Sequence, residues 1–476
     1  MNIRSISALA MASVLGLSAC GGGDGSSSAP PSLPTSPAPT NSGPRFSGAS
    51  AAVSVPENTP GVIAALAASD ADGDALTYTL GGVDAAAFTL SAAGELQFVE
   101  APDFDLPRDG GMDNVYDVIV SASDGKASAQ LAVAVTVTNL AEGVALRRAA
   151  SGIDRPVGLD LGPDGSVIVA QADGRVWRID GQSGRRVLEA ELPLEAGTEL
   201  IDIAYGRGDP RDSRPGVVAM TRSARGVGLL RLSGEGRAVR QLLASGAPEG
   251  AGGAIAFGRG GLLYAAVGDP DGMRAQGESG YGRSFVPTDH NGGDLTARFA
   301  IAKAGYGVRQ PGGMVGMGEG WMLLADQAGT GEHEIDRIAS QSAARTAAMP
   351  NFGWPFYAGT VMQKDGAPAG LSAPQLVYAA GDGPRQGEGV VLGGVYAGEN
   401  ASLRDKFIFG DRNGAVWAVP EAALRSGALS RMDTIEDRSE DFAPDQGTLD
   451  GIVEIKTDSR GHVYILDRDG ELFVLG

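Results

Sequence analysis

The chain has 476 residues, 43% of them hydrophobic, which is enough for about three domains with cores of their own. Its formal net charge of −20 makes nucleic acid and anionic membrane faces poor partners and favours divalent cations. Past the N-terminus no stretch approaches the roughly 18 consecutive apolar residues of a membrane-spanning helix, so we expect none in the mature protein.

Residues 1–20 have the pattern of a bacterial export signal. Arg4 precedes an apolar stretch at 6–17 that is too short to span a bilayer. The string Leu-Ser-Ala-Cys, which ends at Cys20, resembles the lipobox of bacterial lipoproteins. The resemblance implies cleavage before Cys20, the only cysteine, and its lipidation. The alternative is an ordinary signal peptide with an incidental cysteine.

Residues 21–45 consist almost entirely of Gly, Ser, Pro, Ala and Thr, the composition of a disordered tether. We therefore expect a protein that is lipid-anchored to a bacterial membrane and faces the periplasm or the cell exterior. Because the only cysteine would carry lipid, we expect no disulfide bonds.

Residues 46–142 form a predicted β-sandwich. Alternating apolar residues in AVSV, LTYTL, LQFV, VYDVIVSAS and LAVAVTV indicate about seven short strands with turns between them. Four segments resemble, in order, the motifs of a bacterial cadherin-like repeat: PEN at 56–58, DADGD at 70–74, PDFD at 102–105 and VYDVIVSASDG at 115–125.

The cadherin-like resemblance implies two groups of Ca²⁺ ligands, since Ca²⁺ takes six to eight hard oxygens from loops of this kind. Glu57, Asp103 and Asp105 would line the C-terminal end of the repeat, and Asp70 and Asp72 would face a preceding repeat. Each group is a half-site here, so Asn139, Glu142 or the edge of the following domain would have to complete it. The alternative is that these acids are solvated turn residues.

Residues 143–476 repeat one phrase about six times: a Gly/Asp turn, an alternating apolar strand, a second Asp/Gly turn and another strand. Examples are DGSVIVAQ followed by DGRVWRI, and GHVYILD followed by DGELFVL. Recurrence about every 50 residues without a helical period predicts propeller blades. We therefore predict an all-β protein, a six-bladed β-propeller preceded by a cadherin-like β-sandwich.

Within the predicted propeller, several segments resemble the soluble PQQ-dependent glucose/sorbosone dehydrogenases. They are GIDRPVGLDLGPDGSVIVAQADGRVWRID (152–180), GGAIAFGRGGLLYAAVGD (252–269), YGVRQPGG (306–313), NFGWP (351–355) and KFIFGDRNGAVWAV (406–419). The resemblance implies PQQ and Ca²⁺ as cofactors and an aldose-type sugar as substrate.

By the same resemblance, a histidine two residues before the paired glycines would take the substrate's hydroxyl proton, but this chain has Gly250 there. Asp269 would orient that base, Arg309 would polarise the cofactor, and Arg412 would pair with a cofactor carboxylate. Gln310 stands where the family has asparagine. Ala328 and Gly329 replace the Gly-Pro pair whose carbonyls would hold the cofactor's Ca²⁺.

Two functions remain open. One is a PQQ-dependent sugar dehydrogenase-like protein that lacks the expected base. The other is a non-catalytic, calcium-binding adhesion protein that recognises a glycan or a surface protein through the sandwich and an eroded propeller cup. His290, in the string His-Asn-Gly-Gly, is either a relocated base or a plain loop histidine.

Overall fold

The computed structural model describes residues 40–476 except 163, 207–215, 233–237, 246–251, 259–261, 273–274, 277–279, 286–301 and 340–348. Cys20, Gly250 and His290 therefore lie outside the described residues. Within the described part, residues Gly43–Gly476 group into one compact unit, and no helix is long and apolar enough to cross a membrane.

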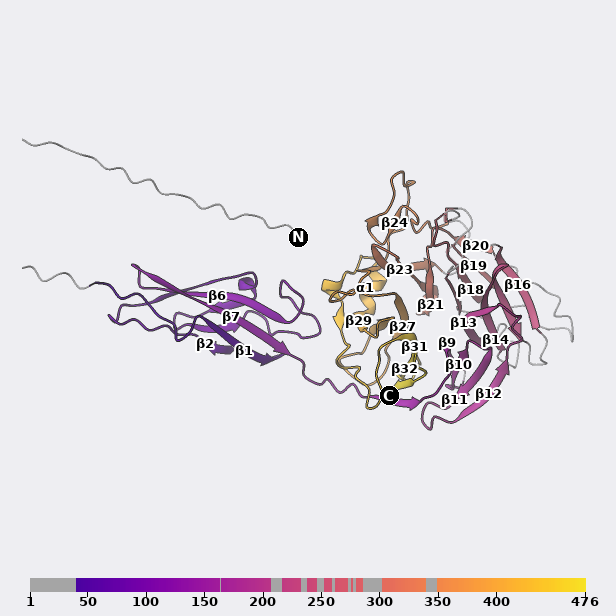
Figure 1. The fold of residues 1–476 in the computed structure, drawn as a ribbon, viewed down its shortest axis with the longest axis horizontal. Coiled ribbons are helices and arrows are strands. Elements are labelled where there is room, and N and C mark those ends of the chain that lie inside the picture. Colours follow the sequence, from indigo (N-terminus) through magenta and orange to yellow (C-terminus); the bar gives the residue numbers. More distant parts are fainter. Residues whose placement is uncertain are drawn as a thin grey trace, which may run out of the picture. The chain divides into compact units, whose positions relative to one another are not determined.

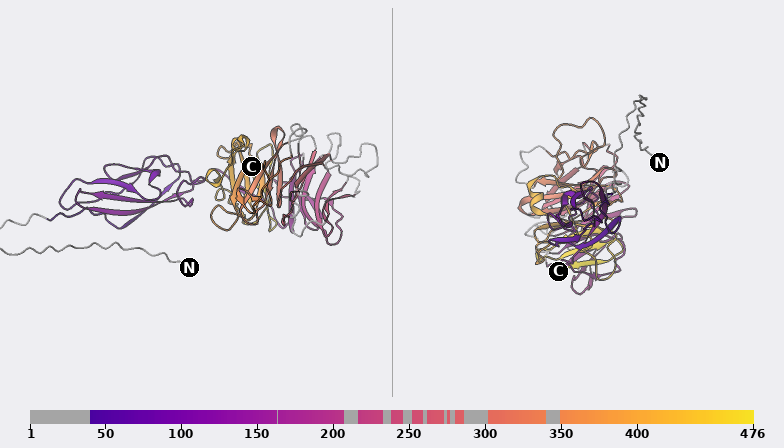
Figure 2. Two further views of the ribbon diagram at one scale, coloured as in Figure 1. Left: turned by 90° about the horizontal axis from the view of Figure 1, so that it is seen from above. Right: turned by 90° about the vertical axis from the view of Figure 1, so that its left-hand side faces the viewer.

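Two sheets form the predicted sandwich. The first has the order β1 (Ser50–Pro56), β7 (Ser128–Thr138), β6 (Val115–Ser123) and β3 (Thr77–Gly81). The second has the order β2 (Val62–Ala65), β5 (Glu95–Phe98) and β4 (Phe88–Leu90), with a 3₁₀ turn η1 at Ala85–Ala87. β1 runs parallel to β7, and the other pairs are antiparallel. Figure 2 shows these strands, in indigo and purple, lying along one another.

The alternating pattern explains the sandwich, because successive side chains of a strand point to opposite faces. Along β6 the residues alternate between buried and more exposed, and the buried ones face the other sheet. Phe88, Phe98 and Tyr116 meet in that core, with Tyr116 edge-on to Phe88 at 5.7 Å and to Phe98 at 5.2 Å between ring centroids. The seven predicted strands are confirmed.

Six four-stranded sheets follow in the described residues, and they are the predicted blades. Blade 1 consists of β9 (Pro156–Leu161), β10 (Val167–Gln171), β11 (Arg175–Ile179) and β12 (Arg186–Glu191). Blade 2 consists of β13 (Glu199–Gly206), β14 (Gly216–Ser223), β15 (Gly226–Leu232) and β16 (Ala238–Ser245). Blade 3 consists of β17 (Gly253–Phe257), β18 (Leu262–Val267), β19 (Gly280–Phe285) and β20 (Ala302–Gly305).

Blades 4 to 6 continue the same up-and-down order. Blade 4 consists of β21 (Pro311–Met317), β22 (Trp321–Asp326), β23 (Glu332–Ala339) and β26 (Leu376–Ala379). Blade 5 consists of β27 (Val390–Val395), β28 (Lys406–Asp411), β29 (Val416–Pro420) and β30 (Glu436–Asp437). Blade 6 consists of β31 (Ile452–Thr457), β32 (Val463–Asp467), β33 (Leu472–Leu475) and β8 (Leu146–Ala150). Smaller elements are the hairpin β24 (Tyr357–Ala358) and β25 (Val361–Met362), the helix α1 (Glu421–Ser426), and the 3₁₀ turns η3 (Gly318–Gly320) and η4 (Met432–Thr434).

The blades close into a ring. The first strand of each blade packs beside the first strand of the next, in the order β9, β13, β17, β21, β27, β31 and back to β9. Figure 1 shows the labelled members of this set around the propeller centre. The sixth sheet is completed by β8, the strand that comes first along the chain, which pairs antiparallel with β33. This pairing joins the two ends of the propeller.

Acidic side chains on the first strands tie neighbouring blades together. Each carboxylate accepts a backbone N–H from the first strand of the next blade. The pairs are Glu454 with Leu159 (2.6 Å), Asp160 with Tyr205 (2.7 Å), and Asp202 with Ile255 (2.7 Å). Lys456 contacts Glu454 and supplies a cation to this buried group. Hydrogen bonds and charge pairing offset the cost of burying the carboxylates.

A second set of acidic side chains explains the aspartates of the recurrent Gly/Asp sequence motif. The aspartate at the end of a blade's second strand accepts N–H groups from the loop before that blade's first strand. The pairs are Asp326 with Arg309 and Gln310, Asp411 with Glu388 and Gly389, and Asp467 with Asp450 and Gly451. These bonds fix the loops that surround one end of the propeller axis.

Candidate functional site

A cavity of about 440 Å³, here called the cup, lies at this end of the axis. Its lining includes Gly252, Gln310, Arg222, Arg412, Arg468 and Glu454. The structure therefore brings the predicted cofactor residues Gln310 and Arg412 to one cavity. Arg309 adjoins it, because its Nη1 donates to Gln310 Oε1 at 3.3 Å.

Arg309 is held in a defined place beside the cup. Its Nη1 also donates to the Gln327 carbonyl at 2.9 Å, and its guanidinium lies 5.3 Å from the Trp354 ring centroid. Gly329 allows this approach, since a Cβ there would stand 2.3 Å from Arg309 Nη2. Burial lowers the pKa of Arg309 from its usual high value. The loop that the sequence assigned to a cofactor Ca²⁺ is thus already in contact with a guanidinium.

Arg412 projects from the turn after β28 and is solvent-exposed. With the Gln327 side-chain oxygen turned toward it, that oxygen accepts from Arg412 Nη2 at 2.9 Å and from Nε at 3.2 Å. Desolvation and the nearby charge of Arg468 both lower the pKa of Arg412. The backbone carbonyl of Arg412 accepts from Arg468 Nη2 at 3.0 Å.

Asp269 stands two residues after the end of β18 and is buried at 3% exposure; Val267, and not Asp269, has the register position that Asp326, Asp411 and Asp467 hold in their blades. The N–H of Asp269 donates to Val308 O at 3.3 Å, and its carbonyl accepts from Trp354 Nε1 at 2.7 Å. These backbone bonds tie Asp269 to two neighbouring loops, and they do not by themselves assign its carboxylate a catalytic role. The base position, Gly250, lies outside the described residues.

The two described histidines lie away from the cup lining. His333 is fully buried; its Nδ1 accepts from Ala328 N–H at 3.1 Å, so the neutral ring carries its proton on Nε2 and donates to Gly387 O at 3.0 Å. Burial lowers the pKa of His333. Both nitrogens are engaged, which makes His333 a support for the 327–329 loop. His462 pairs with Asp458 at 2.9 Å on blade 6.

The predicted carboxylates at the C-terminal end of the sandwich do gather. One oxygen each from Glu57, Asp103 and Asp105 lies within 4.8 Å of the others. Glu57 accepts from the N–H groups of Phe104 (3.1 Å) and Leu140 (2.9 Å). Asp105 is 3% exposed, and its Oδ1 has no hydrogen-bond partner among the described residues.

Arg438, which sequence reasoning missed, contacts the same cluster. It is 1% exposed and forms ion pairs with Asp105, with Glu142 at 2.6 Å and with Asp441 at 2.8 Å. Burial raises the pKa of Asp105 to about 8, although Arg438 opposes the shift. Glu142 was a predicted completing residue, and Asn139, the other, lies 3.5 Å from Asp441 Oδ1. A local motif could not reveal Arg438 because it lies 333 residues from Asp105.

The second predicted half-site also brings its acids together. Asp70, Asp72 and Asp74 each place an oxygen within 4.8 Å of the others. Asp70 Oδ1 accepts from the N–H groups of Asp72 at 2.8 Å and Asp74 at 3.3 Å, and Asp74 pairs with Lys126 at 2.9 Å. Turn formation explains these bonds without an ion.

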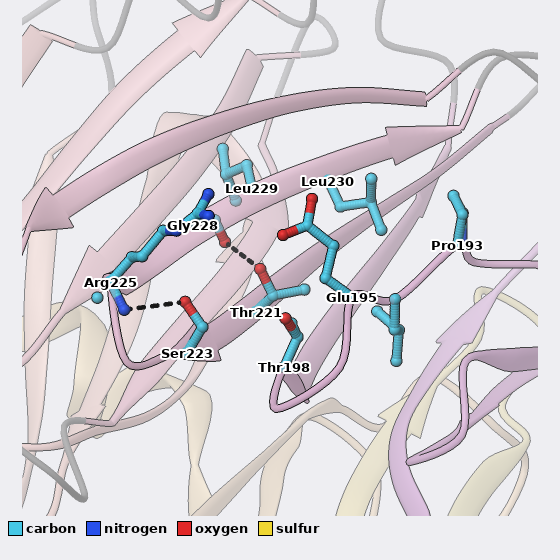
Figure 3. Close-up of a pocket in the computed structure, with 11 residues that line it drawn as sticks. Pro193, Glu195, Thr198, Thr221, Ser223, Arg225, Gly228, Leu229 and Leu230 are labelled. Carbon is cyan, nitrogen blue, oxygen red and sulfur yellow. Dashed lines mark hydrogen bonds between the residues drawn. The ribbon is translucent and has the colours of Figure 1, made fainter.

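A smaller cavity of about 260 Å³ lies over blade 2 (Figure 3). Hydroxyl groups of Thr198, Thr221 and Ser223 line it together with Glu195 and Arg225. Thr221 donates to Gly228 O at 3.4 Å, and Ser223 Oγ accepts from Arg225 N–H at 3.2 Å. None of the predicted site residues lies there.

Comparison with known proteins places the propeller among known folds. No family model and no curated protein matches the chain. The PQQ-bound aldose sugar dehydrogenase of Streptomyces coelicolor is 18% identical with a TM-score of 0.51, covering 70% of this chain and 98% of its own. The apo-form soluble aldose sugar dehydrogenase of Escherichia coli is 18% identical with a TM-score of 0.50, covering 70% and 99%.

At these identities the likeness shows the fold alone. Drosophila N-cadherin EC1-3 is 24% identical over 20% of this chain and 34% of its own, with a TM-score of 0.18. That score is too low to carry an argument, and the sandwich rests on its own strand pairing.

Proposed function

We propose that the chain is a lipid-anchored periplasmic or cell-surface protein whose propeller binds PQQ as a sugar dehydrogenase-like protein does. The observation that carries this proposal is the cationic lining of the cup. Arg412 and Arg468 line one cavity, and Arg309 adjoins it through Gln310, in a chain of net charge −20. PQQ is a tricarboxylate, and guanidinium groups bind carboxylates through paired hydrogen bonds.

The residues of the cup would have different roles in binding this cofactor. Arg412 would hold a carboxylate, while Arg309, fixed by Gln327 and Trp354, would face the quinone edge with the Gln310 amide beside it. PQQ, when bound, would accept the hydride of an aldose-type sugar. The fold of the aldose sugar dehydrogenases supports the assignment.

Cofactor binding is the direct test. Purified protein is incubated with PQQ, with and without Ca²⁺, then desalted, and retained quinone is read by absorbance. We expect about one PQQ per chain in the unmodified protein and much less in Arg412→Gln. No retained quinone under either condition would refute the PQQ assignment.

Catalysis is expected to be weak because glycine at position 250 offers no base. A positioned general base typically contributes about 10²–10⁴-fold, so aldose oxidation with a dye acceptor should be near background. Gly250→His should recover part of that rate, and Gly250→Gln is the matched control of similar size. Robust oxidation by the unmodified protein that His290→Ala abolishes would show instead that the base has moved.

A non-catalytic recognition protein is the second candidate. It is favoured by the absence of a histidine from the described cup lining and by the full engagement of His333. In this case the cup or sandwich would bind a glycan or a surface protein, with Ca²⁺ at Glu57, Asp103 and Asp105 and at Asp70 and Asp72. Glycan binding by protein that retains no PQQ would favour this candidate.

The anchor is proposed from Cys20 and the tether that follows it. Stable anchoring takes more than one acyl chain, so the mature N-terminus should carry at least two. Metabolic labelling with a fatty-acid analogue should mark the unmodified protein and fail in Cys20→Ser. Label that persists in Cys20→Ser would contradict the lipobox assignment.

A further inference from the structure

Blades 5 and 6 carry the same four-residue turn after their second strand. Blade 5 has Asp-Arg-Asn-Gly at 411–414, and blade 6 has Asp-Arg-Asp-Gly at 467–470. In each turn the glycine has a positive φ, 100° at Gly414 and 90° at Gly470. An added Cβ would meet a backbone oxygen of a neighbouring loop at 2.3 Å or less in both cases, so glycine is required.

The backbone anchors of the two arginines also match. Arg412 N–H donates to Gly389 O at 3.0 Å, and Arg468 N–H donates to Gly451 O at 2.8 Å. Gly389 and Gly451 leave room for the side chains, since a Cβ would stand 3.2 Å from Arg412 Cδ and 3.0 Å from Arg468 Cβ. Arg468 is therefore the blade 6 counterpart of Arg412.

The counterpart relation brings two like charges to one cavity. Both arginines line the cup, and Arg468 Nη2 donates to the Arg412 carbonyl at 3.0 Å. In the part of the chain that the structure describes, no carboxylate lies within ion-pair distance of either guanidinium. Two carboxylates line the cup, and both are bound elsewhere: Asp202 accepts from Ile255 N–H, and Glu454 contacts Leu159 N–H and Lys456.

Two neighbouring guanidinium groups without a counter-ion repel each other, and an anionic ligand would relieve that repulsion. We propose that Arg468 is a second carboxylate-binding residue of the cup, which acts with Arg412 to hold two acidic groups of one ligand. This inference rests on the proposed function, and it adds a binding residue that the family resemblance does not provide.

The test measures binding to the full chain with two probes: PQQ, followed by quenching of intrinsic tryptophan fluorescence, and citrate, followed by calorimetry. Arg468→Gln should weaken PQQ binding by about 10- to 100-fold, as should Arg412→Gln, since each removes a charged hydrogen-bond donor. Arg468→Lys should restore part of the loss, because it keeps the charge without the two-pronged geometry.

Arg460→Gln is the matched control. Arg460 is exposed on the turn between β31 and β32 of the same blade and pairs with Asp458, so its loss changes the net charge equally outside the cup lining. Its binding of both probes should equal that of the unmodified chain. A weakening in Arg460→Gln equal to that in Arg468→Gln would reduce the effect to net charge and overturn the proposal.

The outcomes separate this inference from the proposed function. PQQ binding that Arg468→Gln leaves unchanged would overturn the role of Arg468 while leaving the cofactor assignment in place. Citrate binding that depends on Arg468, with no binding of PQQ, would support the paired site and refute PQQ. Binding of neither probe by the unmodified chain would overturn both.

Discussion

Two arginine clusters differ in the acids around them. Arg438 is buried and forms ion pairs with Asp105, Glu142 and Asp441, whereas Arg412 and Arg468 have no carboxylate within ion-pair distance among the described residues. The chain carries a net charge of −20, and the two acids of the cup lining, Asp202 and Glu454, accept backbone N–H groups and form no ion pair with these arginines. A guanidinium surrounded by acids maintains structure, and one kept apart from acids is available to a ligand.

The comparison also explains the predicted calcium cluster. Glu57, Asp103 and Asp105 supply oxygens as expected for Ca²⁺, but the cation that contacts Asp105 is Arg438. A guanidinium can satisfy several carboxylates at once through its five donors. The expected need for Ca²⁺ at this end is therefore reduced.

The largest effect should come from removing the buried cation. Arg438→Met removes the cation that Asp105, Glu142 and Asp441 share, and breaking a buried ion pair in this way costs about 3–5 kcal/mol. Urea denaturation measures the loss. Arg108→Met, at an exposed pair with Glu100, is the control and should cost at most about 1 kcal/mol.

Ca²⁺ sharpens the same experiment. It should leave the melting temperature of the unmodified protein nearly unchanged and raise that of Arg438→Met, because the freed carboxylates then offer a site to the ion. A large Ca²⁺-dependent rise in the unmodified protein, lost in Asp103→Ala, would show that the half-site binds Ca²⁺ beside Arg438.

A smaller effect concerns pH. Asp105 has a pKa raised to about 8 in the folded chain, above the unfolded value of 3.8. A raised pKa contributes stability that is fully present below the unfolded pKa and is lost as pH rises through the folded one. The free energy of unfolding should thus fall between pH 4 and 8, by at most about 1.4 kcal/mol per pH unit from this group.

Asp105→Asn isolates that contribution, since asparagine does not titrate. The difference in unfolding free energy between the two proteins, measured by urea denaturation at several pH values, should change across this window. Asp109→Asn controls for the loss of another buried aspartate on the sandwich. A difference that stays constant from pH 4 to 8 would mean that Asp105 remains ionised throughout.

The sequence predicted the fold well because its signals are local. Period-2 alternation and Gly/Asp turns depend on neighbouring residues, so both the sandwich strands and the blades could be read from them. The acids of the sandwich could be grouped because they lie in short motifs. Arg438 could not be predicted, because its contacts with Asp105 and Glu142 depend on how distant segments fold together.

Arg468 could be predicted from the sequence only in part. Its Asp-Arg-Asp-Gly turn was visible in the sequence as a repeat of the turn that holds Arg412, but only the blade order shows that the two turns are neighbours. Comparing the blades of one chain with each other could have identified it. The same comparison does not explain Asp269, because Val267 stands where blades 4 to 6 carry their loop-binding aspartate.

The smallest expected effect is on the stability of the ligand-free cup. Arg468→Gln removes one of two repelling charges and breaks no ion pair, so it should leave the free energy of unfolding unchanged or raise it by up to about 0.5 kcal/mol. Raising the salt concentration should shrink any gain, because screening weakens the repulsion in the unmodified protein. Thermal melts at low and high salt check both points, with Arg460→Gln as the control that loses a favourable pair. A loss of more than about 1 kcal/mol in Arg468→Gln would show that this arginine maintains structure as Arg438 does, and the distinction between the two clusters would fail.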